Sequence, residues 1–233
     1  MTTVLLDFFG TLVDYSPGLT DRTFHRSFAV FERLGFRLGH EAWLAGWSGA
    51  LDRLYDTSVV SGVEFSMHEA FDAFAADAGL GDCDPTAVDA FVATFGDEWS
   101  DPVRLIDGVP DLLAGLRARG CAIGLVSNTH SASMVRGHLD AMGVAAAFDV
   151  VVTSVEVGFR KPRPEIYRVA LDALDAAPGD TVFVGDTYDA DFVGPTLLGI
   201  NAYLVVGDGQ VTPDDVPADR RLRSVLELAR LDL

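Results

Sequence analysis

The second half of the chain alternates between helical patterns and short apolar runs, and this alternation constrains its fold more than any other feature. Apolar runs that end in polar residues predict four strands, at 121–127, 148–153, 181–185 and 201–206. Apolar residues at helical spacing predict the helices between and beside them, at 109–118, 131–141, 164–174, 190–198 and 220–230. Strand–helix alternation of this kind predicts an α/β fold, a doubly wound parallel sheet with helices on both faces.

Residues 3–8 predict one more strand of that sheet, far ahead of the others in the chain. Between this strand and the alternating part, from about 20 to 99, apolar residues recur at helical spacing in four stripes. The stripes are rich in aromatic residues, among them Phe24, Phe28, Phe31, Trp43, Trp47, Phe71, Phe74, Phe91, Phe95 and Trp99. We therefore expect a four-helix unit with its own core at 16–99, inserted into a core domain made of 1–15 and 100–233.

The charge balance narrows the range of partners. Lys and Arg number 17 against 35 Asp and Glu, which gives a formal net charge of −18. A chain this acidic repels nucleic-acid backbones and anionic membranes, so we expect neither as a partner. No stretch reaches the roughly 18 apolar residues of a membrane span, and the N-terminus lacks the basic region of a signal peptide. Two distant cysteines, Cys83 and Cys121, suit a reducing compartment, so we expect a cytoplasmic protein. For its oligomeric state we expect a monomer or a homodimer.

Polar side chains follow the predicted strands at the points where the strands end. They are Asp7, Ser127 with Asn128, Lys161, and Asp186 with Asp189 and Asp191. In an open parallel sheet, ligands bind at the carboxyl ends of the strands. We therefore expect these carboxylates, the hydroxyl, the amide and the ammonium group to converge at one edge of the sheet.

Lys161 is the single lysine among 17 basic residues. A lysine that remains in an arginine-rich chain suits a position where only a compact point charge fits. Asp7 and Asp186 would repel each other and any anion unless a divalent cation lay between them, and hard oxygen ligands suit Mg²⁺. Lys161 and Ser127 can then hold the oxygens of a phosphoryl group, which a carboxylate aimed at the phosphorus can attack.

Four segments, in order, resemble the motifs of the haloacid dehalogenase (HAD) superfamily. They are Asp7-Phe-Phe-Gly-Thr-Leu-Val-Asp14, Ser127-Asn128, Lys161-Pro-Arg-Pro and Gly185-Asp186-Thr-Tyr-Asp-Ala-Asp191. The spacing of these segments and the helical insertion after the first one are similar to the subgroup with a four-helix cap. The resemblance implies a Rossmann-like core at 1–15 and 100–233 and a helical cap at 16–99.

The resemblance also implies a nucleophile and a metal site. Asp7 would be the nucleophile, with Thr11 supporting its loop. Mg²⁺ would be held by Asp7, by the backbone carbonyl of Phe9 and by Asp186, with Asp191 close by. These roles are expectations that the resemblance brings.

The same resemblance implies the substrate contacts. Ser127 and Lys161 would hold the phosphoryl group and would act as catalytic residues beside the nucleophile, and Thr11 and Asn128 would also bind the substrate. A cap over the site implies a small phosphorylated molecule that fits beneath it, rather than a folded protein.

The chain departs from the family pattern at Phe9. Most phosphatases of the superfamily carry a second Asp at this position, which protonates the leaving oxygen and later activates water. Phenylalanine does neither, and general acid–base help of this kind is worth about 10²–10⁴ in rate. Three residues are candidates to supply the proton in its place: His25, Asp14 and His130.

Three functions are compatible with this departure. The first is a Mg²⁺-dependent phosphatase or phosphotransferase whose leaving group needs little protonation. The second is a metal-independent 2-haloacid dehalogenase. Halide leaves without a proton, and the dehalogenase branch also has an aromatic residue at the position of Phe9. The third is a non-catalytic binding module. Gly185-Asp186 is the metal-binding form of the fourth motif, and Asp7 and Lys161 are retained, so the first function is the one we expect.

Overall fold

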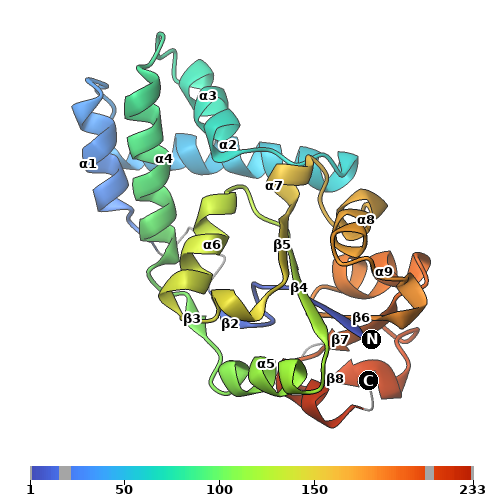
Figure 1. Ribbon diagram of the computed structural model, residues 1–233. Coiled ribbons are helices and arrows are strands. Elements are labelled where there is room, and N and C mark those ends of the chain that lie inside the picture. Colours follow the sequence, from blue (N-terminus) through green and yellow to red (C-terminus); the bar gives the residue numbers. More distant parts are fainter. Residues whose placement is uncertain (1, 16–21, 208–212, 232–233) are drawn as a thin grey trace. The chain divides into compact units, whose positions relative to one another are not determined.

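The computed structural model describes residues 2–15, 22–207 and 213–231, and these form two compact units. One unit comprises Met1–Tyr15 with Arg104–Leu233, and the other is Ser16–Val103 (Figure 1). We call them the core unit and the helical unit. That the helical unit serves as a cap stays a prediction, and its predicted first residue, Ser16, lies outside the described residues.

The core unit is built on a six-stranded sheet in the order β5-β4-β1-β6-β7-β8, and every neighbouring pair is parallel. The strands are β1 (Thr3–Leu6), β4 (Ala122–Ser127), β5 (Val150–Thr153), β6 (Thr181–Gly185), β7 (Asn201–Val205) and β8 (Arg221–Leu222). Every residue of β1, β4 and β6 is buried, as expected for strands covered on both faces. The predicted parallel α/β sheet is therefore confirmed.

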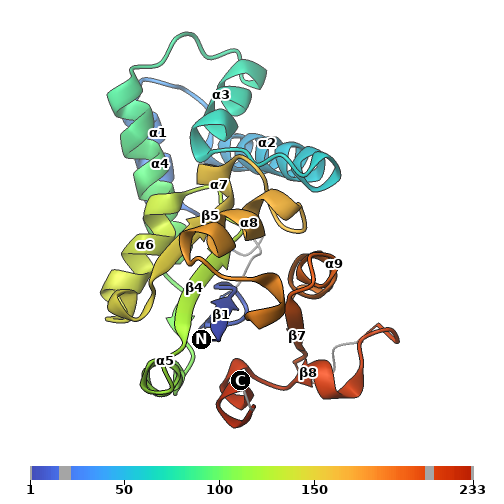
Figure 2. The ribbon, with the colours of Figure 1, turned by 45° about the vertical axis from the view of Figure 1, so that its right-hand side comes forward.

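Helices cover both faces of this sheet. On one face lie α5 (Val109–Ala118) and α6 (Ala132–Ala141), and on the other lie α8 (Pro164–Ala173) and α9 (Gly194–Leu197) (Figure 2). Three short helical segments join the larger elements: η1 (Ala145–Ala147), α7 (Ser154–Val157) and η2 (Pro178–Asp180). The strand order reverses direction between β4 and β6, on either side of β1, so β1 ends at the switch point where open sheets bind ligands.

The helix predicted at 190–198 is wrong in form. The structure has a π-helical segment, η3 (Tyr188–Val193), followed by the short α9. Regular α-helical bonding fails here because the Gly194 N–H donates to the Asp189 carbonyl, five residues back, and Pro195 has no N–H.

The helix predicted at 220–230 is also wrong. The structure has a 3₁₀ turn, η4 (Ala218–Arg220), then β8, then a 3₁₀ helix, η5 (Val225–Arg230). Val225 and Leu228 are buried, and a spacing of three residues aligns side chains on a 3₁₀ helix as well as on an α-helix. The apolar pattern therefore located a packed segment but not its type.

A small ribbon that the sequence did not reveal joins the two ends of the interrupted core unit. β2 (Val13–Asp14) pairs with β3 (Arg104–Leu105) in the antiparallel sense. Strands of two residues are too short to show an alternating pattern, which is why they were not predicted. The ribbon ties the loop after β1 to the segment that leads into α5.

The helical unit consists of α1 (His25–Arg33), α2 (His40–Ser61), α3 (Met67–Asp77) and α4 (Pro85–Ser100), so each apolar stripe falls on a helix. Its core is aromatic: Trp47 lies edge-on to Phe91 and Phe95, with ring centroids 5.1 Å apart in both pairs. The start of α3 is fixed by a capping box, in which the Ser66 hydroxyl accepts from the Glu69 N–H and the Glu69 carboxylate accepts from the Ser66 N–H.

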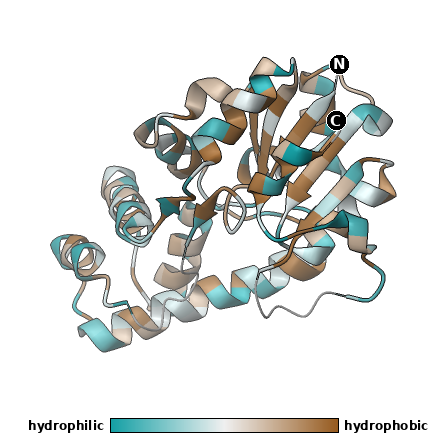
Figure 3. Cartoon of the chain, turned by 90° about the horizontal axis from the view of Figure 1, so that it is seen from below, coloured by the Kyte–Doolittle hydropathy of each residue, from teal (hydrophilic) through white to brown (hydrophobic). Residues whose placement is uncertain are grey.

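The hydrophobic residues are distributed as the positions of the elements in the fold require. The strands of the sheet are hydrophobic, whereas helices such as α2 alternate between hydrophobic and hydrophilic residues (Figure 3). Among the described residues, no helix is both long and apolar enough to cross a membrane.

Candidate active site

Asp7 lies directly after β1, in a tight loop that folds back on itself. The Leu12 N–H donates to the Phe8 carbonyl at 2.9 Å, and the Thr11 hydroxyl donates to Asp7 Oδ2 at 3.1 Å. Gly10 has a φ of +80°, and a Cβ at this position would overlap the Asp186 carboxylate. Glycine is therefore required for the loop to approach the next strand end so closely.

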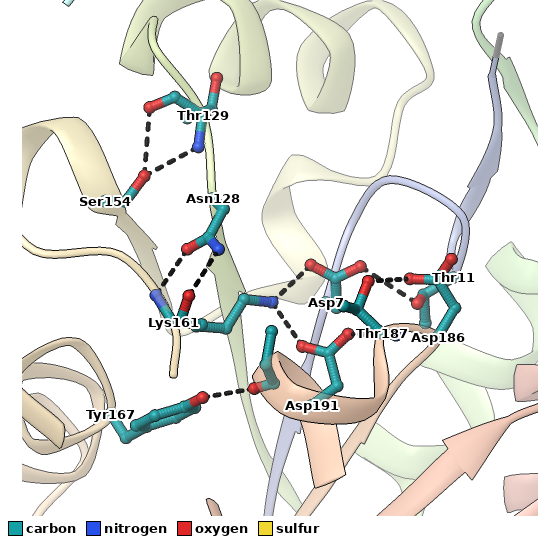
Figure 4. A network of polar contacts seen from close by, with 11 residues as sticks. Asp7, Thr11, Asn128, Thr129, Ser154, Lys161, Tyr167, Asp186, Thr187 and Asp191 are labelled. Carbon is teal, nitrogen blue, oxygen red and sulfur yellow. Dashed lines mark hydrogen bonds and ion pairs between the residues drawn. The ribbon is translucent and has the colours of Figure 1, made fainter. Parts of the chain in front are cut away.

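Lys161 is buried between two carboxylates (Figure 4). Its Nζ donates to Asp7 Oδ1 at 2.6 Å and to Asp191 Oδ1 at 2.7 Å. The loop that carries it is held by Asn128, whose side chain accepts from the Lys161 N–H at 2.8 Å and donates to the Lys161 carbonyl at 3.1 Å. Asn128 thus fixes the lysine backbone, while its expected contact with substrate stays a prediction.

The remaining carboxylates come from the end of β6 and the π-helical turn after it. Asp186 follows β6 directly, and Asp191 lies on η3 with its Oδ2 accepting from the Thr187 N–H at 2.9 Å. Asp7, Asp186 and Asp191 each present an oxygen, and these oxygens all lie within 4.8 Å of one another. Asp189, by contrast, is exposed and stands outside this carboxylate cluster.

The carboxylate cluster of Asp7, Asp186 and Asp191 carries more negative charge than Lys161 balances. Burial, reinforced by the neighbouring carboxylates, raises the pKa of Asp7 to about 7 and that of Asp186 to about 6. Burial by itself would lower the pKa of Lys161, but Asp191 and Asp7 raise it overall. The ammonium group therefore stays charged. One ammonium does not balance three carboxylates, so a further positive charge would be electrostatically favourable in this site. Three hard oxygen donors at this spacing suit Mg²⁺.

Ser127 ends β4 with its hydroxyl fully buried. Within the part of the chain that the structure describes, its Oγ has no hydrogen-bond partner. A buried hydroxyl of this kind is costly unless something binds it, so it suits an oxygen of an anionic ligand.

Phe9 offers no polar side-chain atom to the site. Its half-buried ring lies among other rings, with centroid distances of 4.9 Å to Phe8, 5.3 Å to Tyr15 and 6.5 Å to His138. Burial lowers the pKa of His138, which disfavours the imidazolium form. The ring of Phe9 is therefore in contact with other aromatic rings. Whether its backbone carbonyl binds a metal stays a prediction.

The three candidates for a replacement proton donor lie in different places. Asp14 is exposed at the end of β2, and His130 is half-buried in the loop after β4. His25 begins α1 in the helical unit and stacks on His40, with ring centroids 4.8 Å apart. Which of the three, if any, supplies the proton stays a prediction.

Two polar contacts near the carboxylate cluster escaped the sequence analysis. The Thr187 N–H binds Asp191, and the Tyr167 hydroxyl donates to the Ala190 carbonyl. A backbone N–H leaves no trace in a sequence, and Tyr167 falls on the apolar stripe of a helix, where an aromatic residue predicts only packing.

The family is settled by a match to a family model described as haloacid dehalogenase-like hydrolase, over residues 1–194. The chain belongs to the haloacid dehalogenase-like hydrolase family. The match spans both the strand-end residues of the site and the helical unit, so the resemblance found in the four motifs is confirmed.

Relatives of this HAD-like hydrolase include proteins named as phosphatases. Human haloacid dehalogenase-like hydrolase domain-containing protein 3 is 34% identical over 128 residues, 54% of this chain and 50% of that protein. Phosphoserine phosphatase of Thermus thermophilus is 38% identical over 111 residues, 48% of this chain and 43% of that enzyme. The chain thus aligns with about half of the length of these curated relatives.

A solved structure gives the same fold. The 2-haloacid dehalogenase of Pseudomonas syringae superimposes with a TM-score of 0.74 at 20% identity, covering 99% of this chain and 97% of that one. At this identity the likeness shows the fold of the HAD-like hydrolase and leaves its reaction to be argued from the site.

Proposed function

We propose that the chain is a Mg²⁺-dependent phosphatase or phosphotransferase that acts on a small phosphorylated metabolite through an aspartyl-phosphate on Asp7. The observation that carries this proposal is the carboxylate cluster, Asp7, Asp186 and Asp191, closed on one side by Lys161. Such a cluster is electrostatically costly without a cation. Relatives named as phosphatases give it further support.

The metal would be held by Asp7, Asp186 and the backbone carbonyl of Phe9, with Asp191 close by. When bound, Mg²⁺ supplies positive charge that offsets the carboxylates and the oxygens of a phosphoryl group. The pKa values of Asp7 and Asp186 are raised, first by burial and then by the neighbouring carboxylates, and a divalent cation would offset both effects.

The side chains of the site would then divide the chemistry. A carboxylate oxygen of Asp7 forms a bond to phosphorus, the bond from phosphorus to the leaving oxygen breaks, and the leaving group takes that electron pair. Lys161 and the buried Ser127 hydroxyl donate to the non-bridging oxygens, and Thr11 holds the Asp7 carboxylate in place. Water attacks the phosphorus of the aspartyl-phosphate in a second step, which releases phosphate and restores Asp7.

Phe9 keeps a second candidate function open. A ring among rings beside the nucleophile loop cannot protonate a leaving group, and a halide leaving group needs no proton. A 2-haloacid dehalogenase that uses Asp7 as nucleophile would fit this feature. It would not explain a carboxylate cluster suited to a divalent cation, so we rank it second.

The first prediction concerns selectivity among leaving groups. Without a general acid, the native enzyme should hydrolyse p-nitrophenyl phosphate or acetyl phosphate far faster than a simple alkyl phosphate. An alcohol has a much higher pKa than p-nitrophenol or acetic acid, so an alkoxide gains most from protonation as it leaves. Phe9→Asp should raise alkyl-ester hydrolysis by about 10-fold or more. Phe9→Asn is the control: asparagine has the size of aspartate but no acidic group, so this variant should not hydrolyse alkyl esters faster than the native enzyme. Equal native rates on alkyl and aryl esters, measured as phosphate release, would contradict this.

The second prediction tests the metal site directly. Asp186→Asn should weaken Mg²⁺ binding, measured by calorimetry, by about 10- to 100-fold, because it removes one charged oxygen from the carboxylate cluster. Asp186 is only partly buried, so the fold should survive. Asp189→Asn removes an exposed carboxylate from the next turn and should leave binding unchanged. Undiminished Mg²⁺ binding by Asp186→Asn would contradict the proposed metal site.

A further inference from the structure

In the π-helical turn that carries Asp191, the Ala190 carbonyl lacks a donor from its own helix. In an α-helix the Ala190 carbonyl would accept from the Gly194 N–H, but that N–H donates to the Asp189 carbonyl instead. In a continued π-helix the donor would be residue 195, which is proline and has no N–H. Because Ala190 is buried, its carbonyl needs a donor from elsewhere.

Tyr167 supplies that donor. Its hydroxyl, on α8, donates to the Ala190 carbonyl, and the side chain points at the turn that bears Asp191 (Figure 4). The tyrosine is fully buried, with its ring edge-on to Phe183 at a centroid distance of 5.6 Å. Burial, with the charges of Asp191 and Asp7, raises the pKa of this hydroxyl, so it remains protonated and able to donate.

The packing around this hydrogen bond leaves it little freedom. A Cβ at Gly194 would overlap the Tyr167 hydroxyl and lie within 2.9 Å of Pro162 Cβ. Pro162 follows Lys161, whose Nζ binds Asp191. The Tyr167 hydroxyl therefore lies where the loop that carries Lys161 packs against the π-helical turn. The residue that it binds, Ala190, directly precedes Asp191 of the carboxylate cluster.

We infer that Tyr167 is a positioning residue for the carboxylate cluster: its hydroxyl completes the π-helical turn at Ala190 and thereby holds Asp191 in register with Lys161, Asp7 and Asp186. In its consequence for metal binding, this inference rests on the proposed function. Without the hydroxyl, the Ala190 carbonyl loses this donor, and we expect the turn, and with it the Asp191 carboxylate, to shift.

The test compares two variants of the chain that each lose one buried hydroxyl. Tyr167→Phe removes the bond to Ala190, and it should raise the Mg²⁺ dissociation constant, measured by calorimetry, by about 10-fold. Thr181→Val is the matched control: Thr181 is fully buried, and its hydroxyl donates to the Ala177 carbonyl at 2.9 Å. It lies at the opposite end of β6 from Asp186, so Mg²⁺ affinity should be unchanged.

A merely structural role would lower the unfolding temperature of both variants and leave Mg²⁺ affinity alone. Wild-type affinity in Tyr167→Phe, or an equal loss in Thr181→Val, would therefore overturn the inference. Failure of the wild-type protein itself to bind Mg²⁺ would count against the proposed function instead, and the two failures are distinguishable.

A second variant tests the carbonyl itself. Pro195→Ala, added to Tyr167→Phe, supplies an N–H five residues after Ala190, where a π-helical donor belongs. We expect this double variant to regain most of the lost Mg²⁺ affinity. If the double variant binds Mg²⁺ no better than Tyr167→Phe alone, the donor to Ala190 is not what matters, and the inference fails.

Discussion

Replacement of Asp7 by asparagine is expected to lower kcat/KM for acetyl phosphate by about 10⁴-fold or more, because it removes the proposed nucleophile. The amide oxygen of asparagine can still accept from Lys161, and the Thr11 hydroxyl can turn to accept from the amide nitrogen. The variant should therefore fold.

The covalent intermediate gives this prediction its control. Wild-type protein quenched in acid after incubation with labelled acetyl phosphate should carry the label on the peptide that contains Asp7. Asp189→Asn, which changes an exposed carboxylate, should label and turn over normally. Substantial turnover by Asp7→Asn, or a label on another residue, would remove Asp7 from the role of nucleophile.

Replacement of Lys161 by arginine is expected to cost about 10²–10³ in kcat/KM although it keeps the charge. The lysine side chain is 2% exposed, and its Nζ lies 2.6 and 2.7 Å from two carboxylate oxygens. A guanidinium is a planar fork wider than this space, so it would push the carboxylates apart. The charge-assisted contact to a phosphoryl oxygen would be misplaced as well, and one such contact is worth about 10²–10³ in rate.

The reverse exchange in the same loop is the control for this prediction. Arg163 is paired with Glu165 in an exposed position, and Arg163→Lys should retain nearly full activity, since exposed ion pairs contribute little. Nearly wild-type kcat/KM in Lys161→Arg would mean that the survival of the single lysine has no connection with the geometry of the site.

The strand ends could be predicted from the sequence because each buried strand is an unbroken apolar run followed by a polar residue. Asp7, Ser127 and Asp186 stand at such points, and parallel strands bring their carboxyl ends to one edge. Lys161 is predicted less directly, since a loop separates it from β5. Its place between Asp7 and Asp191 depends on contacts that no local pattern records.

The segments that were predicted wrongly share one physical cause. Apolar residues three or four apart mark a packed face but do not distinguish the α-helix from its 3₁₀ and π relatives. In the segment from Tyr188 to Leu197, the exception is signalled by Gly194-Pro195, since a proline inside a helical pattern removes a donor. In η5 nothing comparable appears in the sequence, so its 3₁₀ form could not be predicted.

The carboxylate cluster and Phe9 point to different reactions: the cluster favours a metal-dependent phosphatase, whereas Phe9 favours a leaving group that needs no proton. Under the proposed function, the cluster would bind a cation that in turn offsets an anionic substrate, while the ring of Phe9 has no group that could protonate an alkoxide. Both features are compatible in a phosphatase whose substrates are acyl or aryl phosphates, or other esters with a stable leaving group.

The most direct test of the proposed function is a substrate panel assayed with Mg²⁺ and with EDTA. The panel contains acetyl phosphate, p-nitrophenyl phosphate and 2-chloropropionate, with phosphate and chloride release measured in parallel. We predict that Mg²⁺ supports phosphate release, that EDTA abolishes it, and that no chloride is released under either condition. Chloride released from 2-chloropropionate in EDTA, without phosphate release from either ester, would contradict the proposal and identify a metal-independent dehalogenase.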